Sequence, residues 1–221
     1  MKGLKFKNGA IGYRHFPKVA CTSIKQEMYR VDNKVTYSES REGRHIHDYY
    51  NARLVDIDEC SFKFTVVRDP IQRFLSAYSN RVTHHMEASK KHLDEVGVVS
   101  DITFPVYNPS LSQFMEFFDL YSKIPSISWH IKPYAEFIAD FDIFDSIYPI
   151  NEIYSLEKDL SEIIGENIKF GREQTGGKKF SVKELKSTDV DFLLDYYSKD
   201  YELLAQYFSV DDVWKKWKSP K

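Results

Sequence analysis

Residues 15–25, His-Phe-Pro-Lys-Val-Ala-Cys-Thr-Ser-Ile-Lys, have the composition of a phosphate-binding loop. Pro17 would fix the chain as it leaves a strand, so that Lys18 projects toward the start of the next helix. Thr22 and Ser23 add hydroxyl donors at that helix start. The unpaired N–H groups of a first helical turn and the positive end of the helix dipole attract anions. An ordinary strand–helix turn with a solvated lysine is the alternative interpretation of this segment alone.

Residues 64–78 have the same strand, loop and helix order. Arg68 follows an apolar, β-branched run, and Ser76 lies two turns into the helix that Pro70 would open. A guanidinium fork matches phosphate geometry, and a nearby serine can donate a second hydrogen bond. The alternative is that Arg68 pairs with Asp69 or a helix end and that Ser76 is merely small. Two such segments in one chain predict a ligand with two separated phosphates.

The composition is that of a globular protein with 221 residues, 42% hydrophobic and 15% aromatic. The net charge of −2 provides no global basic bias toward nucleic acid or an anionic membrane. Only Cys21 and Cys60 are present, which fits a reducing compartment. No apolar run approaches the ~18 residues of a membrane span, and the start of the chain lacks a signal-peptide pattern. We therefore expect a soluble, cytoplasmic protein.

Alternating strand and helix patterns predict an α/β fold with a central parallel sheet flanked by helices. We expect a hairpin-like or strand segment within 4–16 and strands within 60–67 and 144–150. We expect helices at 22–29, 70–78, 110–121 and after 155, and a long helix at 189–208. The stretch 31–44 lacks periodicity and is predicted to be a loop. Residues 1–221 are expected to form one domain, with 83–109 as a mobile segment at the mouth of a cleft.

The two loops together resemble the nucleotide-binding motifs of sulfotransferases, enzymes that use 3′-phosphoadenosine-5′-phosphosulfate (PAPS). In that family a Pro-Lys-x-x-x-Thr-Ser loop holds the 5′-phosphosulfate, and an Arg-Asp-Pro-x-x-Arg-x-x-Ser-x-Tyr segment holds the 3′-phosphate. Residues 17–23 and 68–78 match both motifs. The match is closest to the Golgi-type carbohydrate sulfotransferases, the family 2-like branch, and their bacterial relatives. It extends to a basic loop at 171–180, an acidic helix start at 157–160 and a Tyr-rich helix at 196–207.

The resemblance implies a P-loop-NTPase-like, three-layer fold and the transfer of a sulfuryl group from PAPS to a carbohydrate or glycan-like hydroxyl. Adenosine 3′,5′-bisphosphate (PAP) would be released, and no metal or nucleic acid would be needed. The chain shows neither the anchor nor the lumenal disulfides of eukaryotic relatives, which favours a bacterial or phage-type cytoplasmic enzyme.

The resemblance also assigns roles to individual residues. Lys18 would neutralise the charge that builds on the leaving phosphate, while Arg68 and Ser76 would hold the 3′-phosphate. The loop at 171–180 would close over the nucleotide. The residues expected to hold the donor are Pro17, Lys18, Ala20, Cys21, Thr22, Ser23, Ile24, Arg68, Ser76, Arg172, Lys178 and Lys179.

A hydroxyl acceptor needs a general base, for which histidine is the usual side chain near neutral pH. His45 and His47 come first, because heparan-type members of the family have a His-x-His there. His130 comes next, since residues 129–133 resemble a His-Trp-x-Pro element of other branches. Any one of them, like His84, His85 and His92, could equally be a solvated or structural histidine.

The residues that would bind the acceptor are less clearly marked in the sequence than those that would bind the donor. Aromatic rings stack on sugar faces and arginines pair with acidic sugars, although core packing and solvation are the commoner roles. The residues of these types are Trp129, Tyr134, Tyr49, Tyr50, Arg41, Arg44, Arg53 and Arg81.

Two other functions fit the pattern less well. A Mg²⁺-dependent, kinase-like phosphotransferase would need Gly-x-x-x-x-Gly-Lys-Ser/Thr, but the first loop has no glycine and 176–179 is not followed by Ser or Thr. A non-catalytic nucleotide-binding module is the third possibility, and the presence of Lys18 together with several histidines weighs against it.

Overall fold

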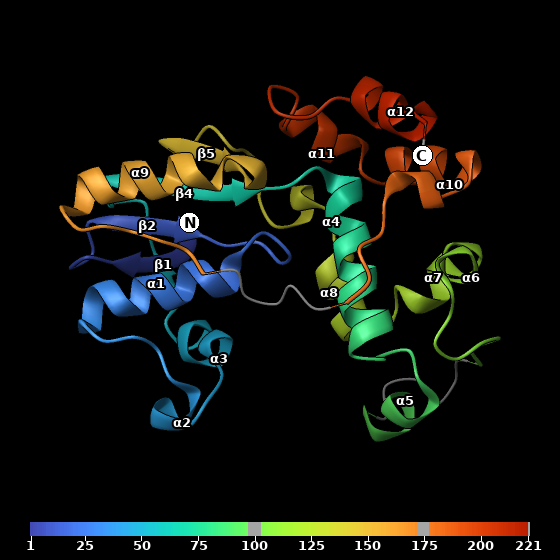
Figure 1. The fold of residues 1–221 in the computed structure, drawn as a ribbon, viewed down its shortest axis with the longest axis horizontal. Helices are drawn as coiled ribbons and strands as arrows, with labels where there is room; N and C mark the ends of the chain where they lie inside the picture. The colour runs from blue at the N-terminus through green and yellow to red at the C-terminus, as the bar shows by residue number, and fades with distance from the viewer. Residues whose placement is uncertain (97–102, 172–176, 221) are drawn as a thin grey trace. The chain divides into compact units, whose positions relative to one another are not determined.

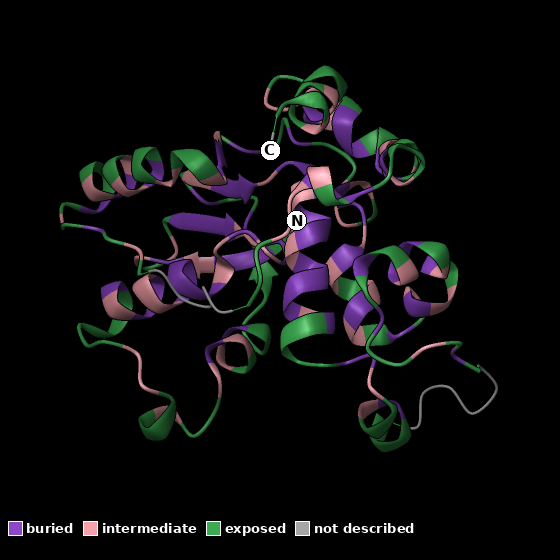
Figure 2. Cartoon of the chain, turned by 45° about the vertical axis from the view of Figure 1, so that its right-hand side comes forward, coloured by how far each residue is buried: buried purple, intermediate pink, exposed green. Residues whose placement is uncertain are grey.

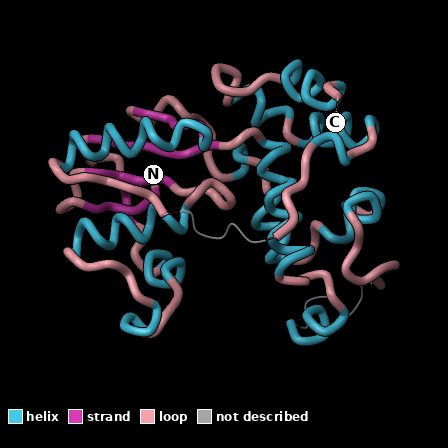
Figure 3. Tube along the Cα trace, in the orientation of Figure 1, coloured by secondary structure: helices cyan, strands magenta, loops and turns pink. Residues whose placement is uncertain are grey.

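The computed structural model describes residues 1–96, 103–171 and 177–220 (Figure 1). The chain divides into two compact units. The sheet unit comprises 1–68 and 141–175, and the helical unit comprises 69–140 and 176–221. Among the described residues, every strand lies in the sheet unit, as Figure 3 shows.

The sheet unit contains five short strands and the helices that connect them. Its elements are β1 (Lys2–Phe6), β2 (Ile11–Arg14), α1 (Cys21–Asn33), α2 (Glu39–Glu42), α3 (Ile46–Asn51), β3 (Val55–Asp56), β4 (Phe62–Val67), β5 (Ser146–Pro149), the 3₁₀ turn η3 (Ile150–Glu152) and α9 (Ile153–Ile164).

The sheet has the strand order β3-β1-β2-β4-β5. Strand β4 pairs in parallel with β2 and with β5, whereas β1 pairs antiparallel with β2 and β3. Aromatic side chains fill its core, with the rings of Tyr13 and Phe64 stacked at 4.9 Å between centroids. Helix α1 contacts β1, and α9 contacts β5.

The prediction of an α/β fold with a central sheet flanked by helices agrees with this unit. The predicted parallel pairing holds for β2, β4 and β5, whereas β1 runs antiparallel to both of its neighbours. A tight turn joins β1 to β2, in which Lys7, Asn8 and Gly9 all have positive φ. A connection this short can only produce an antiparallel pair, whereas a parallel pair needs a long crossover.

The helical unit has no strand among its described residues. Its elements are α4 (Pro70–Ala77), the π-helix η1 (Tyr78–His84), α5 (Lys90–Val96), α6 (Leu111–Glu116), α7 (Phe118–Tyr121), α8 (Pro125–Ile131), η2 (Tyr134–Glu136), η4 (Val182–Glu184), α10 (Ser187–Tyr196), α11 (Ser198–Leu203) and α12 (Val210–Lys218). Aromatic side chains dominate its core, including Phe74, Phe114 and Tyr121. Figure 2 shows buried residues along the strands and within the helical unit.

Two local predictions are wrong. The long helix expected at 189–208 is broken, because Tyr197 leaves helical geometry with φ −102° and ψ 16°, and α11 starts anew at Ser198. The loop expected at 31–44 contains the end of α1 and the short helix α2. Within 83–109, helix α5 forms, while 97–102 lie outside the described residues.

Arg73 is fully buried in the helical unit and organises its interior. Its guanidinium donates to the carbonyl oxygens of His130 and Lys132, and lies 4.0 Å from the carboxylate of Asp200. Its Cζ atom also sits 4.3 Å from the centroid of the Tyr134 ring. Asp200 in turn accepts hydrogen bonds from the N–H groups of Tyr134 and Ala135. This arginine, the second in the Arg-Asp-Pro-x-x-Arg segment, therefore has a structural role.

We expect Arg73→Ala to lower the free energy of unfolding by about 3–5 kcal/mol, because it leaves the buried Asp200 charge and two carbonyls without their partner. Urea unfolding would measure the change. Lys91→Ala is the matched control, since Lys91 pairs with Glu95 on the exposed face of α5 and should cost less than about 0.5 kcal/mol. Equal effects of the two substitutions would contradict a structural role for Arg73.

Candidate active site

The loop between β2 and α1 holds its backbone in an unusual conformation. Lys18 and Ala20 both have left-handed geometry, with φ of 68° and 59°. Residues with a Cβ atom adopt this region at a cost of about 1–2 kcal/mol each. A left-handed residue beside right-handed ones turns successive N–H groups toward one concavity, which is how backbone binds anions. Strain at a loop of this kind is typical of functional sites.

Helix α1 begins at Cys21, directly after this loop. Among the described residues, no side chain caps its start, and its first turn holds no acidic residue. The N–H of Ile24 donates to the carbonyl of Ala20 at 3.1 Å. We therefore do not count Ile24 among the backbone N–H donors considered for an anion. The N–H groups of the residues before it, 21–23, are the ones that a helix start leaves for a ligand.

The parallel pairing of β2 and β4 places two expected anion-binding segments at the same edge of the sheet. Arg14 is paired with Thr65, whose hydroxyl donates to the Arg14 carbonyl at 2.7 Å. The Lys18 loop leaves β2 at this edge, and Arg68 follows the end of β4. Ligands of parallel sheets bind outside the carboxyl ends of such strands.

Asp69 and Pro70 start helix α4 in the helical unit. The Asp69 carboxylate accepts a hydrogen bond from the Gln72 N–H at 2.9 Å, and Pro70 occupies the first turn. Burial raises the pKa of Asp69, which also accepts from the Tyr201 hydroxyl. Ser76 lies half-buried further along α4. Asp69 therefore caps the helix.

The described part of the late basic loop is anchored to the π-helix η1. The Ser79 hydroxyl donates to the Lys178 carbonyl at 2.5 Å. Gly177 has a φ of +96°, and a Cβ there would lie 3.2 Å from the Ser79 hydroxyl oxygen, so glycine is required. Lys178 is exposed and pairs with Glu184 at 3.0 Å, and Lys179 is exposed. Arg172 lies outside the described residues.

His45 and His47 lie at the start of α3 with their rings stacked at 5.1 Å between centroids. The Nδ1 atom of His45 accepts a hydrogen bond from the His47 N–H, so His45 caps the helix. The two residues do not lie on an extended chain, because helix α3 begins at Ile46, between them.

His47 joins α3 to α1 through both of its ring nitrogens. Its Nε2 atom lies 3.0 Å from the Thr22 hydroxyl oxygen, and its Nδ1 atom lies 3.1 Å from the Lys25 Nζ atom. Lys25 is buried, and burial lowers the pKa of its amine from 10.5 to about 8. At neutral pH this amine therefore still carries its proton in most molecules.

Sequence reasoning missed Lys25 and His15. Lys25 follows Thr22 by three positions and Cys21 by four, so all three lie on one face of α1, a spacing that was visible in the sequence. His15 is largely buried at the end of β2, and its Nδ1 atom has no hydrogen-bond partner among the described residues. Burial, helped by Lys25 and Arg14, holds the pKa of His15 well below its usual 6.5.

Cys21 lies at the start of α1, where the charges of Lys18 and Lys25 act on its thiol. Burial raises the pKa of its thiol, while the positive charges of Lys25 and Lys18 act in the opposite direction. Cys21 and Cys60 are both free thiols.

His130 lies in the last turn of α8, in the helical unit. Its Nδ1 atom donates to the Ser126 carbonyl at 2.6 Å, because a carbonyl can only accept. This contact places a proton on Nδ1 of the His130 ring.

Most of the residues considered for acceptor binding have other contacts. Arg53 and Arg44 lie over the Tyr49 ring, and Arg41 lies over Tyr29. Arg81 pairs with Glu87, while Tyr50 and Tyr134 are buried. Trp129 differs, since it is 54% exposed and keeps one edge against Phe137. It is the aromatic residue of this group that could still stack on a sugar.

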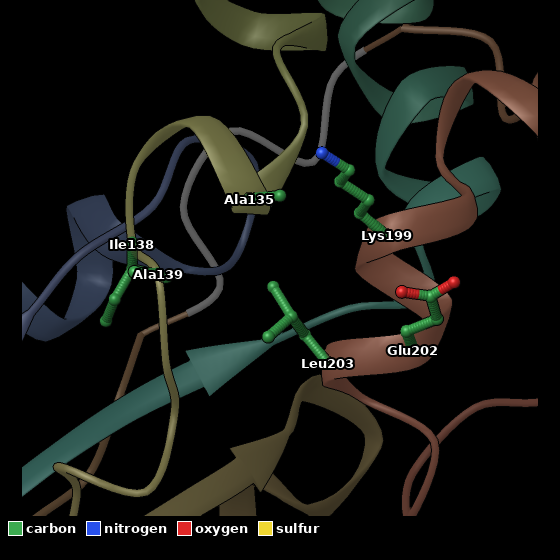
Figure 4. A pocket seen from close by; sticks show the side chains of 6 residues that line it. All are labelled: Ala135, Ile138, Ala139, Lys199, Glu202 and Leu203. Atoms are coloured by element: carbon green, nitrogen blue, oxygen red, sulfur yellow. The ribbon is translucent and has the colours of Figure 1, made fainter.

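A cavity of about 390 Å³ opens in the helical unit beside α11 (Figure 4). Its lining combines small or aliphatic side chains with one lysine and one glutamate: Ala135, Ile138, Ala139, Lys199, Glu202 and Leu203. None of these is a residue that the sequence predicted for the site.

Two searches over the described ranges gave no result. In residues 1–96, 103–171 and 177–220, no group of three or more His, Cys, Asp or Glu side chains could hold a metal ion. None of the helices described there has the length and apolar character needed to cross a lipid bilayer.

A family model described as "Sulfotransferase family" matches residues 7–207 of the chain. The match runs through both units and includes both segments that the sequence predicts to bind a nucleotide. No curated protein and no solved structure matches the chain significantly. The resemblance noted in the sequence is confirmed at the level of the family.

The lowered pKa of Lys25 predicts how stability depends on pH. Between about pH 8 and 10.5 the unfolded chain keeps this proton and the folded protein releases it, so folding becomes more favourable as the pH rises. Lys25→Met removes this contribution, which amounts to at most about 3 kcal/mol. Urea unfolding at several pH values should show the stability of Lys25→Met relative to wild type declining across this window.

Lys158→Met, at an exposed position on α9, is the control for the loss of one charge. A difference between Lys25→Met and wild type that stays constant from pH 7 to pH 10.5 would mean that Lys25 is not desolvated as described.

Proposed function

The chain belongs to the sulfotransferase family, and from this membership we propose that it transfers a sulfuryl group from PAPS to a hydroxyl of a carbohydrate or glycan-like acceptor. Sulfuryl transfer is the activity of the family, while the donor and acceptor are our proposal. The observation that carries it is the left-handed backbone of Lys18 and Ala20 at the uncapped start of α1. Such a loop suits a phosphate group better than an ordinary strand–helix turn does.

The proposed donor site combines this loop with the segment that follows β4. Lys18 and the N–H groups of residues 21–23 would hold the 5′-phosphosulfate, with Pro17 and Ala20 shaping the loop. Arg68 and Ser76 would hold the 3′-phosphate, and Lys178, Lys179 and Arg172 would cover the nucleotide. The chemical fit of the first part is good, because the start of α1 has N–H donors and basic groups but no acidic residue in its first turn.

The reaction would proceed by attack of the acceptor oxygen on sulfur. A new O–S bond forms while the bond between sulfur and the 5′-phosphate oxygen breaks, and PAP leaves. The Lys18 ammonium would stabilise the negative charge on that phosphate, as in phosphoryl transfer. The acceptor proton passes to a general base.

His45, His47 and His130 are the bases considered for this step. The His130 ring uses Nδ1 to donate to the Ser126 carbonyl. His45 uses its Nδ1 atom to cap α3, and His47 uses both nitrogens in contacts with Thr22 and Lys25. Of the three, we propose His130 as the base.

Trp129 is our proposal for the side chain that stacks on a sugar acceptor, because it is the exposed ring next to His130 in the chain. The alternative functions are a Mg²⁺-dependent kinase-like phosphotransferase and a nucleotide-binding module without turnover.

A thermal-shift experiment separates the three functions. We expect PAP to raise the melting temperature of the wild-type protein without metal, and by more than ATP or ATP with Mg²⁺. Lys18→Ala should bind PAP more weakly, keep its circular dichroism spectrum, and transfer no measurable sulfate from labelled PAPS to a panel of glycans. Preferential stabilisation by ATP with Mg²⁺ would favour the kinase instead. PAP binding by a wild type that transfers nothing would favour the non-catalytic module.

Alanine substitutions at His45 and His130 test the base. A general base contributes about 10²–10⁴-fold to the rate, so we expect His130→Ala to lower kcat by this factor while the affinity for PAP is kept. His45→Ala should mainly destabilise α3, which a lower melting temperature would reveal. Normal turnover by His130→Ala would exclude His130 as the base.

A further inference from the structure

Thr22, His47 and Lys25 form a continuous chain of hydrogen bonds within the sheet unit. The Thr22 hydroxyl lies 3.0 Å from Nε2 of His47, and the Lys25 amine lies 3.1 Å from Nδ1 of the same ring. Thr22 and Lys25 are buried on α1, and the ring comes from α3. This series of hydrogen bonds therefore starts at the buried Lys25 amine and ends at Thr22, in the first turn of α1. That turn directly follows the loop that holds Lys18 and Ala20.

The chemistry of the three groups sets the direction of these hydrogen bonds. An ammonium group has only donors, so Lys25 donates and Nδ1 of His47 accepts. A neutral imidazole that accepts at Nδ1 carries its proton on Nε2. That Nε2–H donates to the Thr22 oxygen. The hydroxyl proton of Thr22 is then left to point at a different acceptor.

We propose that Lys25 and His47 are positioning residues for Thr22, which they orient so that its hydroxyl proton is donated to the 5′-phosphate of the nucleotide at the start of α1. This inference rests on the proposed function, because it assumes that a nucleotide anion binds there. It removes His47 from the candidate bases and gives Lys25, which follows the phosphate-binding motif, a role in donor binding.

The arrangement also accounts for the burial of a lysine. Moving an ammonium group out of water is costly unless it is paired, and the pKa of Lys25 is lowered to about 8. An apolar residue would be expected at this position if it served only to pack α1 against α3. A bound phosphate would offset the desolvation cost of the Lys25 ammonium group, since its negative charge would lie at the other end of the series of hydrogen bonds.

The groups around Lys25 determine its response to pH. Cys21 lies on the same helix, Asp48 and His47 lie on α3, and His15 lies at the end of β2. His15 is held neutral, and the Cys21 thiol has a raised pKa, so Lys25 is the group of this set that titrates near pH 8. Affinity for PAP should therefore fall as the pH rises from 7 to 9.

The first experiment needs no nucleotide. Nitrogen-15 NMR of the histidine rings in the ligand-free protein at pH 7 reports which nitrogen of His47 carries the proton. We expect the Nε2–H tautomer in the wild type and a mixture of tautomers in Lys25→Met, which keeps the shape of the buried side chain. An Nδ1–H or doubly protonated His47 in the wild type would overturn the inference, whether or not PAP binds.

The second experiment is a double-mutant cycle on PAP affinity, measured by calorimetry. Lys25→Met and Thr22→Val should each weaken binding about tenfold, and the double variant should be no weaker than either, because both break the same chain. Thr22→Ser keeps the hydroxyl and should bind as the wild type does. The fall in affinity between pH 7 and 9 should disappear in Lys25→Met.

The role of His47 is decided by kinetics. As a positioning residue, His47→Leu should raise the dissociation constant for PAP about tenfold and leave kcat at saturating PAPS within a few-fold of wild type. A loss of kcat by 10²-fold or more with unchanged PAP affinity would make His47 the base and refute the inference. Additive effects of Lys25→Met and Thr22→Val would refute it too. A wild type that binds no PAP would instead refute the proposed function.

Discussion

The parallel pairing of β2 with β4 is the constraint on which the rest of the site depends. It brings Arg14 beside Thr65, and the segments that follow β2 and β4 leave the sheet at the same edge. The loop that carries Lys18 and the segment that starts with Arg68 therefore leave neighbouring strands, although they are far apart in the sequence. Backbone hydrogen bonds set this arrangement, so it does not rely on the side chains that would touch a ligand.

The two arginines of the Arg-Asp-Pro-x-x-Arg segment have different environments, because Arg68 directly follows β4 and Arg73 lies within α4. Arg68 still belongs to the sheet unit, at the end of a strand, and the residue is half-buried. Arg73 is buried in the helical unit against Asp200 and two carbonyl groups. A shared motif therefore contains one side chain suited to recognition and another that holds a core together. Spacing alone does not distinguish them, because each is an arginine near the start of a helix.

The elements that carry the candidate site residues could be predicted because their signals are local in the sequence. The loop before α1 and the helix start at Pro70 follow from proline, small residues and capping side chains, all within a few positions. The contact between Lys25 and His47 could not be predicted, because it joins α1 to a helix that periodicity did not reveal. The break at Tyr197 depends on local backbone geometry that the hydrophobic pattern does not encode. The family model matches residues 7–207, a stretch that contains the two motifs from which the function was interpreted.

The left-handed backbone at positions 18 and 20 places thermal resistance in opposition to readiness for catalysis. Glycine at 20 would relieve the steric cost in the native state, but it would also let the loop sample many shapes when empty. The donor that we propose for this loop would then bind more weakly, because part of its binding free energy would be spent on ordering the loop. With alanine at position 20, the loop backbone is ordered when the chain folds and does not have to be ordered again each time a ligand binds.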